Sequence, residues 1–243
     1  MSAAARLLAL VDLTRLERPD EPGPVDALVA RAMTPAGAVA AVCLYPEWVP
    51  RAVGPLAGTG VRIAAVANFP AGDDDPPRAA EEAAGAAAAG ASEVDVVVPW
   101  QAHRGGDGQA IGRLVGACRE ALGSSVALKA ILESGSLGPP AAVREAASRA
   151  LAAGADFVKT SSGKVGPGAD LRAAEAMLEA IAAAGHGGFK ASGGVRTTSQ
   201  AQAYLELAER ILGPGWPTPA TFRIGASSLL DDLLAGLPDA GRR

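Results

Sequence analysis

The segment GADFVKTSSGK, Gly154–Lys164, contains the pattern that decides the fold. A Gly-Ala pair closes an Ala-rich segment of helical length, and the apolar run DFVKT after it has the length of a β-strand. A Gly/Ser-rich turn then leads toward the next Ala-rich segment. The pattern predicts a helix end, a strand and a loop, which together form the repeating unit of a βα protein.

The same alternation runs through the whole chain about eight times. Strands are predicted at Leu8–Leu13, Ala38–Tyr45, Val61–Asn68, Glu93–Val98, Val126–Glu133, Asp156–Thr160, Gly188–Ser192 and Phe222–Gly225. Helices are predicted at Val25–Met33, Glu47–Leu56, Pro77–Ala89, Gln109–Leu122, Pro140–Ala153, Leu171–Ala184, Ser199–Leu212 and Ser227–Leu234. Eight alternating pairs predict an α/β protein, a TIM (β/α)8 barrel formed as a single domain by residues 1–243.

Prolines and glycines mark the expected helix ends. Pro76-Pro77 and Pro139-Pro140 lie where a first helical turn tolerates proline. The glycines at the predicted helix ends are Gly90, Gly123, Gly154 and Gly185. The alternative α/β fold is a doubly wound open sheet, but no G-x-G-x-x-G motif follows the first predicted strand.

The composition is that of a globular protein with an aliphatic core, because 49% of the residues are hydrophobic and only 4% are aromatic. The net charge is −4 and no basic cluster occurs, so we expect a small-molecule partner rather than nucleic acid or a membrane surface. The N-terminus lacks the layout of a signal peptide and no segment has transmembrane length, which predicts a cytoplasmic protein.

Two features raise the question of a metal. Cys43 and Cys118 lie far apart in sequence, so neither a zinc site nor a disulfide framework is expected. The run Asp73-Asp74-Asp75 precedes a Pro-Pro helix start, where negative charge suits the helix dipole better than it suits a cation site. No metal and no cofactor are therefore expected.

Lysine is rare in this chain. Of 22 Lys and Arg residues only four are lysines: Lys129, Lys159, Lys164 and Lys190. An amine can lose its proton and attack a carbonyl, whereas a guanidinium stays charged and is a poor nucleophile. The four lysines therefore indicate positions where arginine cannot serve, the alternative being that surface lysines survived by chance.

Strand alternation places several charged side chains inside the barrel. In EVDVVVP, Asp95 shares a face with Glu93, and in VALKAILES, Lys129 shares a face with Glu133. A buried carboxylate needs a partner, so Lys129 is interpreted as an ion-pair partner of Asp95, which needs no catalysis to explain it.

Lys159 and Lys190 lie one βα unit apart, on adjacent predicted strands near the same rim. Burial and mutual repulsion would both lower a lysine pKa, which prepares one amine as a Schiff-base nucleophile and makes the other its electrostatic partner. The alternative is two unrelated interior lysines paired with different carboxylates.

The strand ends carry further candidates. Asp12 and Thr14 either orient a polar substrate or form a turn, and Cys43 is a packing residue that could line the pocket. Gly/Ser-rich turns after the last three strands suit a phosphate, because their backbone N–H groups can approach an anion. The predicted phosphate-binding residues are Gly163, Lys164, Gly193, Gly194, Arg196, Ser227 and Ser228.

These residues describe a barrel that forms an imine with a phosphorylated carbonyl compound, as a class I aldolase or a related lyase does. The chain also resembles, from end to end, the deoxyribose-phosphate aldolase family. The resemblance rests on Asp12-Leu13-Thr14, VCLYP at 42–46, NFPAG at 68–72, EVDVVVP at 93–99, LKAILESG at 128–135, DFVKTSSGK at 156–164, FKASGGVRT at 189–197 and RIGASSLL at 223–230.

The resemblance implies reversible cleavage of 2-deoxy-D-ribose 5-phosphate to D-glyceraldehyde 3-phosphate and acetaldehyde in deoxyribonucleoside catabolism, without metal. By resemblance, Lys159 forms the Schiff base, Lys190 perturbs it, Asp95 acts as acid/base with Lys190 and a water, and Lys129 supports Asp95. A homodimer is expected by the same resemblance.

Some family members carry a tyrosine in the C-terminal tail that aids proton exchange at the enamine carbon. This chain ends LLAGLPDAGRR, without tyrosine, so water or another group would have to protonate that carbon.

Two alternatives remain open at this stage: a Schiff-base aldolase for another phosphorylated sugar, and a non-catalytic phosphosugar-binding regulator on the same fold. The combination of Asp95, Lys159 and Lys190 favours an enzyme, since a binding protein needs no reactive amine.

Overall fold

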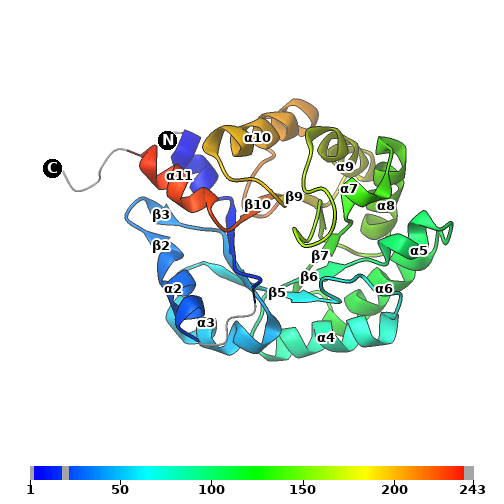
Figure 1. Cartoon of the computed structure of the whole chain (residues 1–243), viewed down its shortest axis with the longest axis horizontal. Helices are drawn as coiled ribbons and strands as arrows, with labels where there is room; N and C mark the ends of the chain where they lie inside the picture. The colour runs from blue at the N-terminus through cyan, green and yellow to red at the C-terminus, as the bar shows by residue number, and fades with distance from the viewer. Residues whose placement is uncertain (1–2, 18–21, 238–243) are drawn as a thin grey trace.

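Eight parallel strands close into a barrel ringed by helices in the computed structural model, which describes residues 3–17 and 22–237 (Figure 1). The order around the barrel is β1-β10-β9-β8-β7-β6-β5-β4, and β1 pairs with β10 to close it. The barrel strands are β1 (Val11–Thr14), β4 (Ala41–Leu44), β5 (Arg62–Ala67), β6 (Glu93–Val97), β7 (Ala127–Ile131), β8 (Phe157–Lys159), β9 (Gly188–Ser192) and β10 (Phe222–Ala226). The predicted TIM barrel is confirmed.

A helix follows each barrel strand and packs on the outside of the barrel (Figure 1). These helices are α2 (Gly23–Arg31), α3 (Val49–Leu56), α4 (Pro76–Ala88), α6 (Ala110–Leu122), α8 (Pro140–Ala152), α9 (Leu171–Ala184), α10 (Thr198–Leu212) and α11 (Leu229–Ala235). Shorter elements are α1 (Ala3–Leu8), the 3-10 helix η1 (Pro46–Trp48), α5 (Trp100–Arg104), α7 (Ser134–Leu137) and a hairpin of β2 (Met33–Thr34) and β3 (Gly37–Ala38). Among the described residues, no helix has both the length and the apolarity to cross a membrane.

The first two strands begin later than predicted. Residues from Leu8 were expected to be strand, but α1 ends at Leu8 and β1 begins at Val11. Leu7, Leu8 and Leu10 are all buried, and so short an apolar run does not distinguish a buried helix from a strand. The second strand was expected from Ala38, which instead lies in the β2–β3 hairpin. The short helices α5 and α7 were not predicted, because five and four residues are too few to show helical periodicity.

The Gly-Ala pairs end helices for a steric reason. Gly90 and Gly154 have φ angles of 111° and 100°, a region that side chains with a Cβ rarely adopt. A Cβ at Gly90 would lie 2.6 Å from Val53, and one at Gly154 would lie 2.9 Å from Arg119. Glycine at these positions therefore lets the chain turn from the end of a helix toward the next strand.

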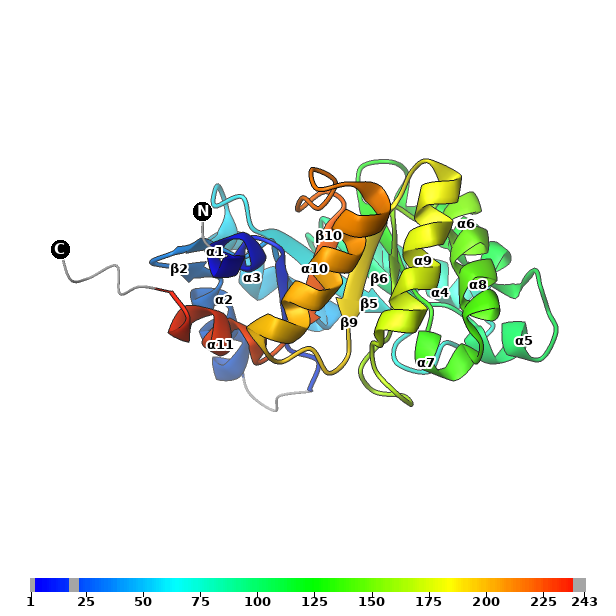
Figure 2. The same ribbon diagram turned by 90° about the horizontal axis from the view of Figure 1, so that it is seen from above.

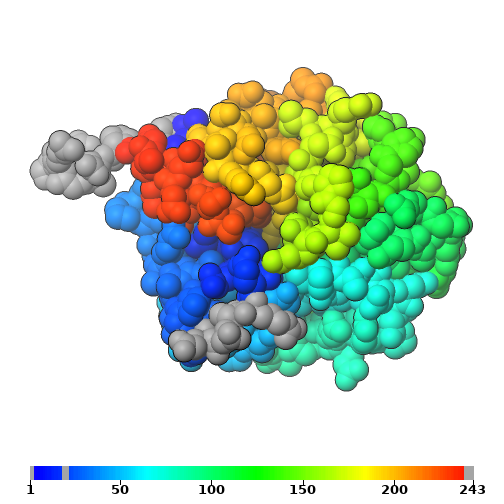
Figure 3. Space-filling model, viewed as in Figure 1, coloured from blue at the N-terminus to red at the C-terminus, as the bar shows by residue number. Residues whose placement is uncertain are grey.

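The two ends of the barrel carry different loops. In Figure 2 the loops that follow β8 and β9 lie at the lower edge of the molecule, and the loop that precedes β10 lies at the upper edge. Figure 3 shows the face where the blue, yellow-green and orange-to-red segments meet, which is the face of the loops that follow the strands. Aliphatic residues fill the layer between strands and helices, and the buried charged side chains of Asp12, Glu93, Asp95, Lys129, Lys159, Lys190 and Arg223 all come from barrel strands.

The aspartate run caps a helix and forms surface ion pairs. The Asp75 side chain accepts a hydrogen bond from the Arg78 backbone N–H at 3.1 Å, at the start of α4. Asp73 pairs with the Arg78 side chain at 2.7 Å, and Asp74 pairs with Arg113 at 3.3 Å. The run therefore stabilises the start of α4, as the helix-dipole interpretation predicted.

Replacing the cap tests this account of the run. We expect Asp75→Ala to lower the free energy of unfolding by about 1 kcal/mol, because an N-terminal N–H of α4 loses its acceptor. Asp74→Ala is the matched control and should change stability little, because it removes only an exposed ion pair. Denaturant unfolding monitored by circular dichroism measures both, and equal losses would contradict the assigned cap.

Candidate active site

The carboxylate of Asp95 in β6 accepts hydrogen bonds from three lysines. Lys159 and Lys190 both donate to Oδ2, each at 2.8 Å. Lys129 donates to Oδ1 at 2.7 Å. All four side chains are at most 1% exposed. One buried carboxylate therefore holds three buried amines together inside the barrel.

The four residues come from four consecutive barrel strands. Asp95 in β6 lies directly opposite Lys129 in β7, and Lys159 in β8 lies opposite Lys190 in β9. Lys159 also lies opposite Ile131, so it stands two residues further along its strand than Lys129 does. Because inward side chains repeat every second residue and the strands are staggered, the lysines reach Asp95 from different levels of the barrel.

A second layer of charge lies closer to the start of the strands. Arg223 in β10 donates to Asp12 Oδ1 at 2.7 Å and to Glu93 Oε1 at 2.8 Å. Glu93 also pairs with Lys129 at 2.5 Å, and Asp12 pairs with Lys190. The two layers form one continuous ion-pair network, and every member is almost fully buried.

The network holds its carboxylates ionised. Burial alone would raise the pKa of Asp95, but Lys129, Lys159 and Lys190 outweigh it and hold the pKa well below the ordinary value. Burial would likewise raise the pKa of Asp12, but Lys190 and Arg223 lower it. The lysines and the arginine therefore favour the charged forms of both carboxylates.

The expected lowering of a lysine pKa is wrong for Lys190. Burial does act in that direction, but the carboxylates of Asp12 and Asp95 outweigh it and raise the pKa of Lys190 above its ordinary value. The pKa of Lys129 is raised for the same reason, through Asp95 and Glu93. Repulsion between lysines is real in this site, but it is smaller than the attraction to the carboxylates that the lysines share.

Lys159 differs from the other two lysines in the number of its carboxylate partners. Lys190 pairs with both Asp12 and Asp95, and Lys129 pairs with Glu93 and Asp95. Within the described residues, Lys159 pairs only with Asp95 Oδ2, an oxygen it shares with Lys190. The alternative of two lysines paired with unrelated carboxylates is therefore wrong, because both contact the same atom.

A polar cavity of about 270 Å³ lies at the end of the barrel where the loops follow the strands. It is lined by the loops that follow β1, β8, β9 and β10, and it contains all seven predicted phosphate-binding residues: Gly163, Lys164, Gly193, Gly194, Arg196, Ser227 and Ser228. Lys164 contacts Glu17 at 3.6 Å, and the Glu17 side chain is 66% exposed. An exposed pair contributes little, so an entering phosphate could take the place of Glu17 at small cost.

Buried hydrogen bonds fix the loops around this cavity. Thr160 and Ser161 both donate to the Ser192 carbonyl, at 2.8 Å and 2.7 Å. Glu133 Oε1 accepts from the Ser162 backbone N–H at 2.8 Å. A Cβ at Gly193 would collide with the Ser161 hydroxyl, so the close approach of the two loops requires glycine there.

The other residues predicted from the sequence are buried or already hydrogen-bonded, which limits their part in any reaction. Asp12 is fully buried in the ion-pair network rather than at a turn, and Thr14 lines the polar cavity while donating to the Asp12 carbonyl at 2.9 Å. Cys43 is fully buried with its Sγ 3.9 Å from Asp95 Oδ2, so it packs beside the site. Lys129 is the predicted ion-pair partner of Asp95.

Sequence reasoning missed Arg223 and the role of Glu133. The alternation of FRIGA places Arg223 on the same face as Gly225, so the period-two rule used for Asp95 would have placed this arginine inside the barrel. Glu133 was predicted to be a strand residue. It instead adopts a left-handed conformation with φ 52°, and no local sequence signal indicates that.

A closed parallel barrel whose interior holds amines against one carboxylate, beside a polar cavity, defines the class of barrel aldolases. A sequence profile described as DeoC/LacD family aldolase matches residues 6–235. The chain belongs to this family and is an aldolase, a carbon–carbon lyase.

Known proteins support the assignment. A deoxyribose-phosphate aldolase of Agrobacterium fabrum is 44% identical over 234 residues, which cover 96% of this chain and 90% of that protein. The deoxyribose phosphate aldolase of Aeropyrum pernix, whose structure is tetrameric, superposes with a TM-score of 0.76 at 25% identity, covering 96% of this chain and 91% of that one. An apo-form structure from Toxoplasma gondii ME49 superposes with a TM-score of 0.88 at 24% identity. The match covers 96% of this chain and 94% of that one, and this likeness shows the fold alone.

Removing the central carboxylate should be costly. We expect Asp95→Asn to lower the free energy of unfolding by about 3–5 kcal/mol, because it leaves buried ammonium groups without their shared counterion. Asp26→Asn is the control, since Asp26 forms an exposed pair with Arg51 at 2.6 Å and its loss should change stability little. Guanidinium unfolding curves of the three proteins make the comparison, and equal stabilities would show that the network does not hold the barrel together.

The two cysteines should resist thiol reagents at pH 8. Burial and the Asp95 charge raise the pKa of Cys43, and burial raises the pKa of Cys118 to about 12, so the reactive thiolate is scarce at this pH. We expect slow alkylation by iodoacetamide in the folded protein and rapid alkylation of both cysteines after unfolding in guanidinium, as measured by mass spectrometry. Rapid labelling of Cys43 in the native state would mean that the barrel interior opens to solvent.

Proposed function

We propose that this aldolase reversibly cleaves 2-deoxy-D-ribose 5-phosphate to D-glyceraldehyde 3-phosphate and acetaldehyde, with Lys159 as the Schiff-base nucleophile. The observation that carries the proposal is that Lys159 and Lys190 both contact Asp95 Oδ2, on the same rim as the polar cavity. The relative from Agrobacterium fabrum supports the choice of substrate.

Lys159 is assigned as the nucleophile because it has the fewest carboxylate contacts of the three buried lysines. Lys190 pairs with two carboxylates and Lys129 with three, whereas Lys159 contacts one carboxylate oxygen, which it shares with Lys190. Only an uncharged amine can attack a carbonyl carbon. Lys159 also lies at the last position of β8, so its amine is next to the loops that line the cavity.

The reaction begins with attack of Lys159 Nζ on the aldehyde carbon, C1, of the open-chain sugar. Loss of water from the carbinolamine gives an iminium ion, which can accept the electron pair of the C2–C3 bond. A base takes the proton of the C3 hydroxyl as that bond breaks, and glyceraldehyde 3-phosphate leaves. Protonation of the enamine at C2 and hydrolysis of the imine then release acetaldehyde and return the amine.

Asp95 and Lys190 are placed to handle the hydroxyl proton. In the iminium ion the Lys159 nitrogen keeps one N–H instead of the three of an ammonium ion, so Asp95 Oδ2 is less fully engaged by lysine donors and can accept a hydrogen bond from elsewhere. Lys190 remains charged beside it, because Asp12 and Asp95 raise its pKa. Proton transfer through Asp95 with Lys190, directly or over one water molecule, fits this arrangement.

The phosphate occupies the polar cavity in this proposal. Lys164 and Arg196 supply positive charge, and the backbone N–H groups of Gly163, Gly193 and Gly194 supply neutral donors. The cavity is lined by residues that follow both Lys159 and Lys190 within a few positions. Binding the phosphate there directs the sugar carbons toward the two amines, which is the positioning that imine formation requires.

The tail does not enter this account. Its last six residues, 238–243, lie outside the described residues, and the sequence there contains no tyrosine. Enamine protonation is therefore assigned to water or to the Asp95–Lys190 pair. A homodimer stays a prediction from the family resemblance, as does a cytoplasmic location.

Substitution of the nucleophile tests the proposal directly. We expect Lys159→Arg to abolish cleavage, by at least about 10³-fold, because the charge remains but the nucleophilic amine is lost. Borohydride added to the wild-type protein with 2-deoxyribose 5-phosphate should leave a reduced adduct on Lys159, identified by peptide mass mapping. Turnover by Lys159→Arg, or an adduct on a different lysine, would overturn the mechanism.

Two comparisons complete the test. Lys164→Ala should raise KM with a smaller change in kcat and should still give the adduct on Lys159, because it removes only a phosphate contact. Ribose 5-phosphate, which adds a hydroxyl at C2, should be cleaved more slowly than the 2-deoxy sugar. Faster cleavage of ribose 5-phosphate would assign the chain to a different phosphorylated sugar.

A further inference from the structure

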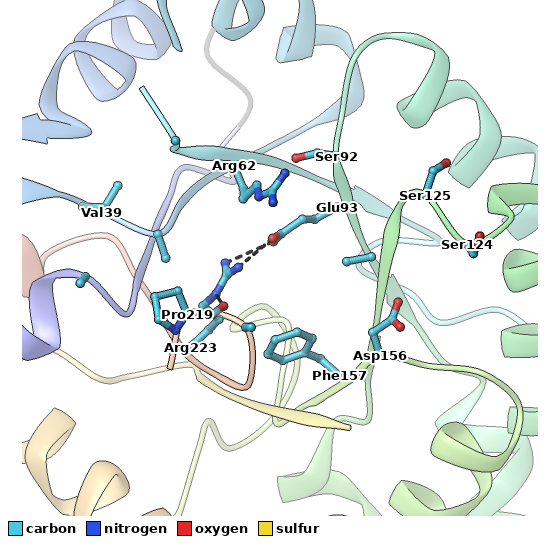
Figure 4. A pocket seen from close by; sticks show the side chains of 15 residues that line it. Val39, Arg62, Ser92, Glu93, Ser124, Ser125, Asp156, Phe157, Pro219 and Arg223 are labelled. Carbon is cyan, nitrogen blue, oxygen red and sulfur yellow. Dashed lines mark hydrogen bonds and ion pairs between the residues drawn. The ribbon is translucent and has the colours of Figure 1, made fainter. Parts of the chain in front are cut away.

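The end of the barrel opposite the phosphate cavity also reaches the ion-pair network. A cavity of about 590 Å³ opens there, and Figure 4 shows the Arg223 guanidinium in it, directed at Glu93 with Phe157 beside it. Arg223 Nη2 lies 2.8 Å from Glu93 Oε1, and its guanidinium carbon lies 5.8 Å from the Phe157 ring centre. Arg223 and Glu93 are each 4% exposed, so the pair is nearly buried although the cavity ends on it.

Arg223 shares both of its carboxylates with the lysines above it. Asp12 binds Arg223 through Oδ1 and Lys190 through Oδ2. Glu93 binds Arg223 mainly through Oε1 and Lys129 through Oε2. Each carboxylate therefore divides its negative charge between the arginine and a lysine, and any change at Arg223 alters the charge available to both lysines.

The buried network contains more cations than paired carboxylates. Its carboxylates are Asp12, Glu93 and Asp95, and its cations are Lys129, Lys159, Lys190 and Arg223. The network is therefore one positive charge in excess when every amine is protonated. Releasing the proton of Lys159 to solvent removes that excess, and Lys159 has the fewest carboxylate contacts of the four cations.

We propose that Arg223 is a positioning residue that influences the charge state of Lys159. Arg223 occupies Asp12 and Glu93 from the base of the barrel, so the network holds one cation more than its carboxylates can neutralise. This excess of positive charge favours the uncharged amine of Lys159. The proposal deepens the aldolase mechanism above and rests on Lys159 being its nucleophile. The permanent charge of a guanidinium suits this role, because an arginine cannot release its proton in place of Lys159.

Other titratable groups around Lys159 are accounted for. Asp95, Cys43 and Glu133 interact with Lys159 directly, and Lys190 shares the Asp95 oxygen with it. Lys129 and Asp12 are connected to it through Asp95 and Lys190. Burial raises the pKa of Glu133 and of Cys43, which favours their uncharged forms. The effect of removing Arg223 does not depend on their state, because that change subtracts one positive charge from the network in any case.

The test is the pH dependence of Lys159 reactivity in charge variants. Arg223→Gln removes a cation, so Lys159 should keep its proton to higher pH. Removing one full charge from a buried network with an effective dielectric constant of about 20 corresponds to a shift on the order of one pH unit. We expect the midpoint of the acid limb of kcat/KM to rise by about that amount. Arg223→Lys, which keeps the charge beside two carboxylates, should retain the wild-type midpoint.

If Arg223 had a purely structural role, the midpoint would not shift in opposite directions when a positive charge and a negative charge are removed. Glu93→Gln removes a carboxylate and should move the midpoint to lower pH. The double variant Arg223→Gln/Glu93→Gln restores the balance and should return the midpoint close to wild type. It removes both partners of a buried pair together, which avoids a lone buried charge, so Glu93→Gln and the double variant decide the question even if Arg223→Gln does not fold. Arg62→Gln is the matched control, because Arg62 lines the same cavity but is exposed to solvent.

A second measurement does not depend on the substrate. Reductive methylation with formaldehyde and cyanoborohydride, followed over pH and located by mass mapping, reports the fraction of Lys159 that is uncharged. If 2-deoxyribose 5-phosphate is not cleaved but these midpoints shift as expected, the proposed function fails and the role of Arg223 stands. Midpoints that stay constant, or that move in the same direction in Arg223→Gln and Glu93→Gln, overturn the role of Arg223.

Discussion

The buried carboxylate of Asp95 is the group on which the rest of the site depends. Three amines inside a barrel would repel one another and would be costly to bury, and among the described residues Asp95 is the side chain that contacts all three. The barrel supplies the geometry for this contact, because β6 to β9 are consecutive and their inward side chains meet in the interior. The residues proposed for catalysis are therefore the same ones that form the buried ion pairs.

The network differs from a set of independent salt bridges. Asp12 and Glu93 are each divided between Arg223 and a lysine, so charge is distributed along the barrel from the cavity at its base to the rim that carries Lys159. In a low-dielectric interior such coupling is strong, and the fate of one proton depends on every member. The barrel thus combines buried fixed charges near its base with an open rim that carries the polar cavity, where we propose that the sugar phosphate binds.

The phosphate cavity depends on a different constraint, the close approach of loops. Hydrogen bonds from Thr160 and Ser161 to the Ser192 carbonyl join the loops after β8 and β9, and Gly193 leaves room for that contact. Among the described residues that line it, Glu17 is the carboxylate, and its pair with Lys164 lies near the surface. The cavity is therefore polar and open, in contrast to the fully buried ion pairs inside the barrel.

The sequence by itself determined the βα rhythm, the inward positions of Asp95, Lys129, Lys159 and Lys190, and seven of the residues that line the polar cavity. These follow from local periodicity and from the rule that loops after parallel strands meet at one rim. Only the tertiary structure decided which carboxylate each amine contacts. It placed Asp12 and Arg223 in the network and raised rather than lowered the pKa of Lys190. The reason is that ion pairing depends on distances of a few ångströms between residues up to 211 positions apart, set by the stagger of the closed barrel.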